Sequence, residues 1–162
     1  MSTCTADLSD ADGDRLRPCV LQWRSFGAAT SFQGPASTVR CLDDNGLVRA
    51  AVREPGLGRV LVVDGGGSLA TALVGDNLAG IAAANGWAGV LVVGAVRDVV
   101  ALAATPIGVL ALGVVPRRGA AAAAGERDVA VAVGGVVVRP GALVVADEDG
   151  VLVDVLHPDV DM

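Results

Sequence analysis

Two short apolar runs, separated by a segment of small residues, most restrict the fold that this chain can form. Residues 59–63 read RVLVV and residues 89–93 read GVLVV, a pattern typical of strands that are buried on both faces of a sheet. The segment Asp76–Asn85 between them is rich in Ala and Gly and predicts a helix. Strand, helix and strand at this spacing predict a βαβ unit with parallel strands and a right-handed crossover.

Polar residues stand where the elements of this unit begin and end. Asp76 opens the predicted helix, and Arg97 and Asp98 directly follow the second strand, with twenty residues between Asp76 and Arg97. Open parallel sheets bind their ligands beyond the carboxyl ends of the strands. We therefore expect two carboxylates and one guanidinium to meet at one edge of the sheet.

Each of these residues also has a purely structural interpretation. Asp76 could cap its helix, Asp98 could cap the next helix, and Arg97 and Asp98 could form an ordinary surface ion pair. In the functional interpretation, free amides at the helix start bind a carboxylate. Asp98 then binds a hard cation, and Arg97 pairs with a substrate carboxylate.

The rest of the chain predicts a layered β/β/α fold. Before the βαβ unit we expect a helix within Thr5–Asp14, an aromatic-anchored entry to the sheet at 21–32, a turn at Gly34-Pro35, a strand Ser37–Leu42 and a helix Leu47–Arg53. After it we expect a helix Val99–Ala104, a strand Gly108–Val115, and short antiparallel strands at 129–133, 136–138, 142–146 and 151–155. A parallel half and an antiparallel half suggest one α/β domain that spans residues 1–162.

Composition excludes several kinds of chemistry. The twelve basic residues are all Arg, so neither a lysine Schiff base nor a Walker lysine can form. The net charge of −6 argues against a nucleic-acid surface. The only histidine, His157, lies in a polar tail, so a metal site would have to rely on carboxylates and water, which favours Mg²⁺ or Mn²⁺. We expect idle thiols, no membrane span, no signal peptide and a cytoplasmic protein.

Two further motifs favour structural roles. The run DGGGS at 64–68 follows a strand, but it lacks the GxGxxG spacing of a dinucleotide site and the acidic, alternating-glycine loop of methyltransferases. We interpret it as a tight turn. The acidic segment at 147–149, followed by Gly150, predicts a hairpin turn, with the alternative that it lends a carboxylate to a site across a subunit interface.

The chain resembles the family that contains regulator of ribonuclease E activity A and the class II 4-hydroxy-4-methyl-2-oxoglutarate aldolases. The resemblance covers nearly the whole chain. It is carried by FGAATSFQGPASTVRCLDDNGLV (26–48), RVLVVDGGGSLATALVGDNLA (59–79), NGWAGVLVVGAVRDV (85–99), AGERDVAVAVGGVVVRPG (124–141) and ADEDGVLV (146–153). It implies a β/β/α swivelling-type fold and a homotrimer with active sites near the subunit interfaces.

The resemblance also implies roles for single residues. In the aldolase branch an Asp is followed, twenty residues later, by Arg-Asp, and the pattern is complete here as Asp76, Arg97 and Asp98. It implies that Asp98 ligates the divalent metal, that Asp76 approaches the metal through water, and that Arg97 contacts the substrate and stabilises the enolate. It further implies that backbone amides hold the pyruvyl carboxylate, namely those of Gly75, Asp76, Asn77 and Leu78.

Regulator members of the family lack the Asp after this Arg, so the presence of Asp98 favours the enzyme branch. The resemblance then implies cleavage of a 2-oxo acid to pyruvate, with oxaloacetate decarboxylation as a side activity. The alternative is a regulator that binds a ribonuclease E-type endonuclease. The aldolases also carry a C-terminal Glu that reaches a neighbouring subunit's metal shell, for which Asp159, Asp161 or the turn at 147–149 are the candidates here.

Overall fold

The structure is a computed structural model that describes residues 4–155. Its first half contains α1 (Thr5–Asp12), β1 (Leu16–Pro18), β2 (Arg24–Ser25), β3 (Phe32–Arg40), α2 (Gly46–Val52), β4 (Val60–Asp64) and β5 (Ala72–Val74). Its second half contains α3 (Asp76–Ala84), β6 (Gly89–Val96), α4 (Val99–Leu102), β7 (Gly108–Val114), β8 (Glu126–Arg127), β9 (Val131–Val133), β10 (Val136–Val138), β11 (Leu143–Asp147) and β12 (Gly150–Asp154).

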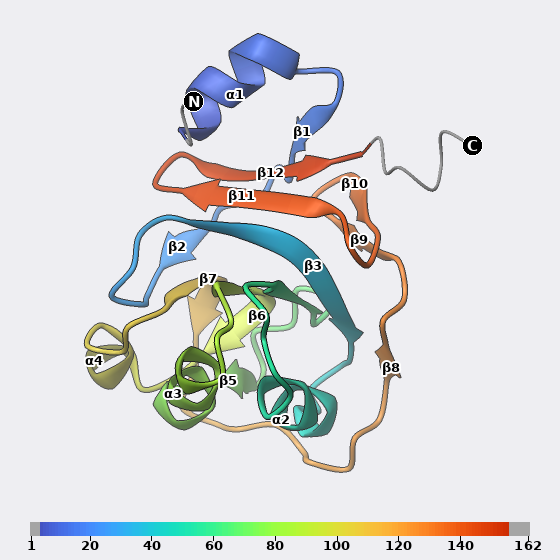
Figure 1. Cartoon of the computed structure of the whole chain (residues 1–162). Helices are drawn as coiled ribbons and strands as arrows, with labels where there is room; N and C mark the ends of the chain where they lie inside the picture. Colours follow the sequence, from blue (N-terminus) through green and yellow to red (C-terminus); the bar gives the residue numbers. More distant parts are fainter. Residues whose placement is uncertain (1–3, 156–162) are drawn as a thin grey trace.

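The elements form a layered β/β/α arrangement, as the sequence predicted (Figure 1). Strands β3, β4, β6 and β7 pair in parallel in that order. Helices α2, α3 and α4 lie on one side of them, and the antiparallel strands β9 to β12 lie on the other (Figure 1). The strands predicted at residues 59–63 and 89–93 pair in parallel, as expected, with residues 60–64 opposite residues 89–93.

Alternating side chains of the central strands pack into two separate cores. In β4, Leu61 and Val63 join the cluster that contains the helices, whereas Val60 and Val62 join the cluster that contains the antiparallel strands. All four side chains are fully buried. A strand covered on both faces has no place for a polar side chain, which explains the uninterrupted apolar run in the sequence.

Strand β3 links the parallel and antiparallel halves and corrects one prediction. The sequence predicted a turn at Gly34-Pro35, but both residues lie inside the strand. The first part of β3 pairs with β11 up to Pro35, and the pairing with β4 begins only at Ala36. Pro35 therefore pairs with a neighbouring strand on one side only. Proline, which has no backbone N–H group to donate, is tolerated at such edge-like positions.

The aromatic entry to the sheet is confirmed by the packing of Phe32. Its ring lies against Gly89 and Gly108, where a Cβ atom on either glycine would collide with the ring. These two glycines face each other in the β6–β7 register. Phe26 is buried in the core on the helix side. The protein thus fits its few aromatic rings into spaces that glycines leave open.

Other expectations are met with small changes in boundaries. The helices predicted at 5–14, 47–53, 76–85 and 99–104 are present, and so are the antiparallel hairpins of the C-terminal part. The acidic segment forms the turn between β11 and β12. Two of the three free cysteines, Cys19 and Cys41, are buried, and burial raises their thiol pKa values to about 12 and about 11. Among residues 4–155, no helix is long and apolar enough to cross a membrane.

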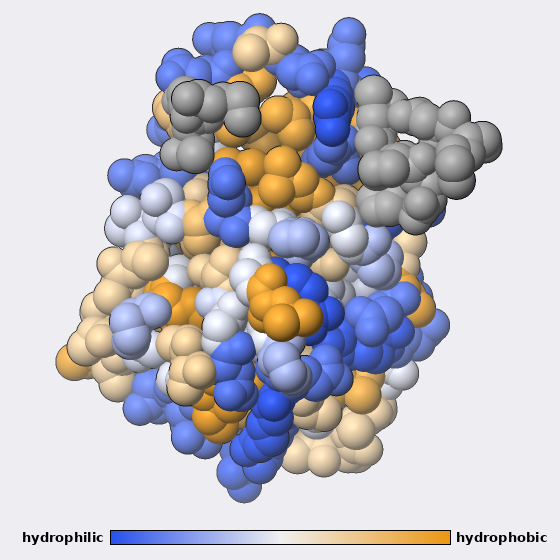
Figure 2. All heavy atoms as spheres, viewed as in Figure 1, coloured by the Kyte–Doolittle hydropathy of each residue, from blue (hydrophilic) through white to orange (hydrophobic). Residues whose placement is uncertain are grey.

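The surface seen in Figure 2 carries hydrophobic patches that are separated by hydrophilic residues. Exposed large apolar side chains come from many different elements, for example Leu42, Leu57, Val100 and Val137. The homotrimer implied by the sequence resemblance stays a prediction.

The buried carboxylate of Asp44 anchors the alanine-rich loop at 119–125. Asp44 is only 4% exposed, and its two oxygens accept hydrogen bonds from the backbone amides of Gly46, Ala122 and Ala123 at 2.9–3.1 Å. The amide of Gly46, followed by amides of the loop, lowers the pKa of this carboxyl group below 3.8, although burial opposes the shift. This carboxylate therefore orders a loop that has no helix or strand of its own.

We expect Asp44→Asn to lower the melting temperature at pH 7, because an amide replaces an oxygen that accepts loop N–H groups. The folded-state pKa is lowered, so the stabilisation by the carboxylate is present above pH 3.8 and is lost as the pH falls through the folded-state value. The difference in melting temperature between the two proteins should therefore shrink below pH 3.8, as measured by circular dichroism. Glu148→Gln in the exposed hairpin turn is the control. A difference that is constant with pH would contradict this role of Asp44.

Candidate active site

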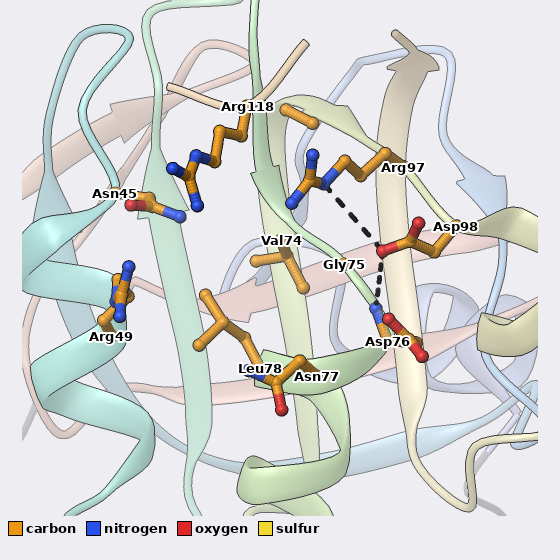
Figure 3. A pocket seen from close by; sticks show the side chains of 11 residues that line it. Asn45, Arg49, Val74, Gly75, Asp76, Asn77, Leu78, Arg97, Asp98 and Arg118 are labelled. Atoms are coloured by element: carbon orange, nitrogen blue, oxygen red, sulfur yellow. Dashed lines mark hydrogen bonds and ion pairs between the residues drawn. The ribbon is translucent and has the colours of Figure 1, made fainter. Parts of the chain in front are cut away.

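The candidate site is assembled by the pairing of two short parallel segments. Strand β5 pairs with the end of β6, with Val74 opposite Val96, and the amide of Arg97 donates to the carbonyl of Val74 at 3.1 Å. This register places Gly75, where helix α3 begins, beside Arg97 and Asp98. The three residues that the sequence singled out, Asp76, Arg97 and Asp98, therefore line one pocket, as expected (Figure 3).

Asp98 has an unusual backbone conformation. Its φ of 63° and ψ of 42° lie in the left-handed region, which costs a non-glycine residue about 1–2 kcal/mol. It occupies the N-cap position of α4, but its side chain makes no capping hydrogen bond. The structural interpretation of Asp98 as a helix cap is therefore wrong, and the conformation turns its carboxylate toward the pocket instead (Figure 3).

The carboxylate of Asp98 packs directly against the start of α3. Its Oδ2 atom accepts a long hydrogen bond of 3.4 Å from the amide of Asp76 and lies 3.9 Å from Nε of Arg97. A Cβ atom on Gly75 would collide with this same oxygen. A side chain at position 75 would therefore displace the carboxylate of Asp98 from its present position.

The start of α3 offers free hydrogen-bond donors to the pocket. Gly75 is the N-cap of the helix and has no side chain, so the alternative that Asp76 caps the helix is also wrong. The first amides of a helix have no acceptor within the helix, and those of Asn77 and Leu78 lie at the pocket wall. Together with the helix dipole they form a binding site for an anion such as a carboxylate.

The pocket has a volume of about 190 Å³, which suits a small molecule, and charged groups line it on both sides. Asp76 and Asp98 contribute two negative charges. Three arginines contribute positive charges, namely Arg97 and two that the sequence analysis did not single out, Arg49 and Arg118. The side chain of Arg97 is 37% exposed, and its contacts with the described residues are the 3.9 Å contact to Asp98 and a 3.5 Å hydrogen bond to the carbonyl of Pro116. Its guanidinium is therefore free to pair with a ligand.

The donor set around Asp98 fits a hard divalent cation that keeps most of its water. Asp98 and Asp76 supply carboxylate oxygens, and the side chain of Asp98 is 42% exposed. Within residues 4–155, no group of three or more His, Cys, Asp or Glu side chains converges to form a cage. Mg²⁺ is commonly held by one or two carboxylates together with water and substrate oxygens, so two carboxylates match its needs.

The glycine-rich run at 64–68 is a tight turn, as predicted. The amides of Gly65 and Gly67 both donate to the carbonyl of Val93, and the amide of Gly66 donates to the carboxylate of Asp64. The amide of Ser68 donates back to the carbonyl of Gly65. Because these donors are used inside the loop, the loop cannot cradle the phosphates of a nucleotide.

The remaining candidates lie elsewhere. The acidic turn at 147–149 lines a different pocket, together with Trp23 and Leu110. Asp147 accepts hydrogen bonds from the amide and the hydroxyl of Thr5, which fastens the N-terminal helix to this turn. His157, Asp159 and Asp161 lie outside the described residues.

Sequence analysis missed Arg118 although the signal was present. Arg118 follows the carboxyl end of β7, so the rule that selected Arg97 also applies to it. Arg49 lies on α2 and Asn45 precedes that helix, and the local sequence gives no sign that this helix faces the sheet edge.

Comparisons with known proteins identify chains that are similar over nearly the whole length. A family model described as RraA-like, Aldolase/RraA, matches residues 5–153. A protein from Alkalilimnicola ehrlichii with the provisional name 4-hydroxy-4-methyl-2-oxoglutarate aldolase is 50% identical over 153 residues, which are 94% of this chain and 95% of that protein.

Two solved structures superpose closely. The RNA-processing inhibitor RraA from Thermus thermophilis has a TM-score of 0.90 and 48% identity, covering 98% of this chain and 96% of that one. A Geobacillus kaustophilus protein described as an S-adenosylmethionine:2-dimethylmenaquinone methyltransferase also has a TM-score of 0.90, with 45% identity, and covers 97% of this chain and 98% of that one. Very similar chains thus carry three different functional descriptions.

The backbone of Asp98 leads to a stability prediction. Asp98→Ala should be less stable than Asp98→Gly by about 1 kcal/mol in urea unfolding, because glycine adopts a left-handed conformation without strain. Asp76 is the comparison, since it is the first residue of α3, where the backbone is right-handed and alanine is favoured over glycine. At position 76 the alanine variant should therefore be more stable than the glycine variant, which is the reverse of the order at position 98. The same order at both positions would contradict the strained conformation of Asp98.

Proposed function

This chain belongs to the RraA-like family, and we propose that it is a divalent-metal-dependent lyase that cleaves 4-hydroxy-4-methyl-2-oxoglutarate to pyruvate. The relative that is 50% identical supports a lyase. One observation carries the proposal, namely that Asp76, Arg97 and Asp98 line one pocket around the free amides of α3. This pattern is the one by which the sequence resembles the aldolase branch rather than the regulator branch.

We assign the metal to Asp98, with Asp76 reaching it through water, and expect Mg²⁺ or Mn²⁺. When bound, such an ion supplies a Lewis acid that withdraws electrons from the 2-oxo group. The chain contains no lysine, so the alternative strategy of a lysine Schiff base is closed to it. The exposed carboxylate of Asp98 supports this assignment, since a ligand can reach it from solvent.

The residues of the chain orient the substrate. The amides of Asn77 and Leu78, at the positive end of α3, donate hydrogen bonds to the carboxylate next to the 2-oxo group. The Arg97 guanidinium lies on the opposite side of Asp98 from these amides (Figure 3). As the bond between C3 and C4 breaks, its electrons move toward C3 and the 2-oxo oxygen, and the fixed charge of Arg97 stabilises the enolate that forms.

Proton transfer completes the cleavage. The 4-hydroxyl group must lose its proton as the second pyruvate leaves, and the enolate then gains a proton at C3. Among residues 4–155 no histidine lines the pocket, and we assign the acceptor role to a water molecule held by Asp76. Decarboxylation of oxaloacetate releases CO₂ and leaves the same enolate, so we expect it as a side activity.

We expect release of pyruvate from both 4-hydroxy-4-methyl-2-oxoglutarate and oxaloacetate in the presence of Mg²⁺, measured with a coupled assay. Chelation of the metal should abolish turnover. Asp98→Asn should reduce kcat/KM by about a hundredfold, since even the residues that only support a metal ligand typically contribute about 10–100-fold. Arg97→Gln should reduce kcat more than it raises KM, because its charge acts mainly on the enolate.

The matched control for Asp98→Asn is Asp128→Asn. Asp128 is also an exposed aspartate with positive φ beside an arginine, but it lies at the end of β8, away from the pocket. Turnover by the wild-type protein that does not exceed the rate with metal alone would refute the enzyme proposal.

A second candidate function is regulation of a ribonuclease E-type endonuclease by direct binding. It is favoured by the 48% identity to a protein described as an RNA-processing inhibitor. Binding through a protein surface does not need the carboxylate of Asp98. If this function holds, capture of the endonuclease should therefore survive Asp98→Asn, whereas pyruvate release should be absent from the wild-type protein.

A further inference from the structure

We propose that Arg118 and Arg49 form a second anion subsite that binds the distal carboxylate of a 2-oxo dicarboxylic acid. The inference rests on the proposed function, because it concerns the far end of the same substrate. A 2-oxo monocarboxylic acid needs only the amides of α3 and Arg97. A substrate with a carboxylate at each end needs a second positive group on the opposite side of the pocket.

The backbone around Arg118 is fixed on both sides. The amide of Ala72 donates to the carbonyl of Arg117 at 2.7 Å, and the amide of Gly119 donates to the carbonyl of Ala72 at 3.3 Å. Gly119 also lies so close to Asp43 that a Cβ atom would come within 2.7 Å of its carbonyl oxygen. These contacts tie the segment after β7 to β5 and hold Arg118 at the pocket, even though its side chain is exposed.

Asn45 and Arg49 bring helix α2 to the same side. The amide of Asn45 donates to the carbonyl of Ala120 at 2.8 Å, and the amide of Arg49 donates to the carbonyl of Asn45 at 2.9 Å. Figure 3 shows Arg118, Asn45 and Arg49 on one side of the pocket, with Arg97 and Asp98 on the other. The subsite therefore faces the proposed reaction centre across the pocket.

The guanidinium groups of Arg49 and Arg118 offer hydrogen-bond donors to a ligand in the pocket. Among residues 4–155, neither Arg49 nor Arg118 forms an ion pair with an acidic side chain. The amide nitrogen of Asn45 is turned toward the guanidinium of Arg118, whereas its Oδ1 atom, an acceptor, is buried without a hydrogen-bond partner (Figure 3). Two guanidinium groups without an acidic partner that face one space match a carboxylate, which accepts from several donors at once.

The net charge of the pocket also suits a ligand with two carboxylates. Two carboxylates and three guanidiniums leave an excess of one positive charge before any metal binds. A divalent cation would raise that excess to three positive charges. Two substrate carboxylates would then lower it to one. A protein with a net charge of −6 thus concentrates positive charge at a single small pocket.

The test compares two non-cleavable ligands that differ only in the distal group. 2-Oxoglutarate has the five-carbon backbone of the proposed substrate without the 4-hydroxyl, and 2-oxopentanoate lacks the distal carboxylate. We expect calorimetry with Mg²⁺ to show that the wild-type protein binds 2-oxoglutarate at least about tenfold more tightly. The affinity ratio is the affinity for 2-oxoglutarate divided by the affinity for 2-oxopentanoate. Arg118→Gln and Arg49→Gln should each reduce this ratio severalfold and leave the affinity for 2-oxopentanoate unchanged.

Arg117→Gln is the matched control, since Arg117 is an exposed arginine next to Arg118 that does not line the pocket. It should leave the ratio at the wild-type value. A wild-type protein that does not distinguish the two ligands, or a ratio unchanged in both variants, would overturn the subsite.

The assay of pyruvate release separates this inference from the proposed function. Cleavage by the wild-type protein together with an unchanged ratio would leave the lyase standing and remove the subsite. A ratio that depends on Arg118 and Arg49, without any cleavage, would retain the dicarboxylate subsite and remove the lyase.

Discussion

The burial of the parallel sheet on both faces is the constraint on which the rest of the structure depends. Strand β6 is buried along its whole length from Gly89 to Val96, so it cannot carry a polar side chain until it leaves the sheet. The first residues that it can use for chemistry are Arg97 and Asp98. The pairing of Val74 with Val96 then brings the start of α3 to the same point. Apolar packing thus determines where the polar site forms.

Much of this could be predicted because it depends on local pattern. The apolar runs identified β4 and β6, and the spacing of Asp76, Arg97 and Asp98 identified the centre of the pocket. Strand β5 has no such pattern, because its three residues become a strand only by pairing with the end of β6. The path of β3 through Pro35 and the positions of Asn45 and Arg49 likewise depend on contacts between distant segments, which no local pattern encodes.

The backbone of Asp98 is less favourable than that of a residue in a regular helix. Asp98 adopts a left-handed conformation, its carboxylate packs against Gly75, and its side chain makes no capping hydrogen bond. Strain of this kind is common at ligand-binding sites, where the surrounding structure holds it in place. The absence of lysine gives the arginines all of the positive charge in the pocket, and guanidinium groups are suited to carboxylates because they can donate two parallel hydrogen bonds.

The central claim is that this pocket generates the enolate of a bound 2-oxo acid. Exchange of the methyl protons of pyruvate in D₂O, followed by ¹H NMR, tests it without any assumption about the physiological substrate. The account predicts that the methyl signal disappears with wild-type protein and Mg²⁺, and that it persists with chelator or with Arg97→Gln. A methyl signal that persists in all samples, while calorimetry shows that pyruvate binds the wild-type protein, would contradict it.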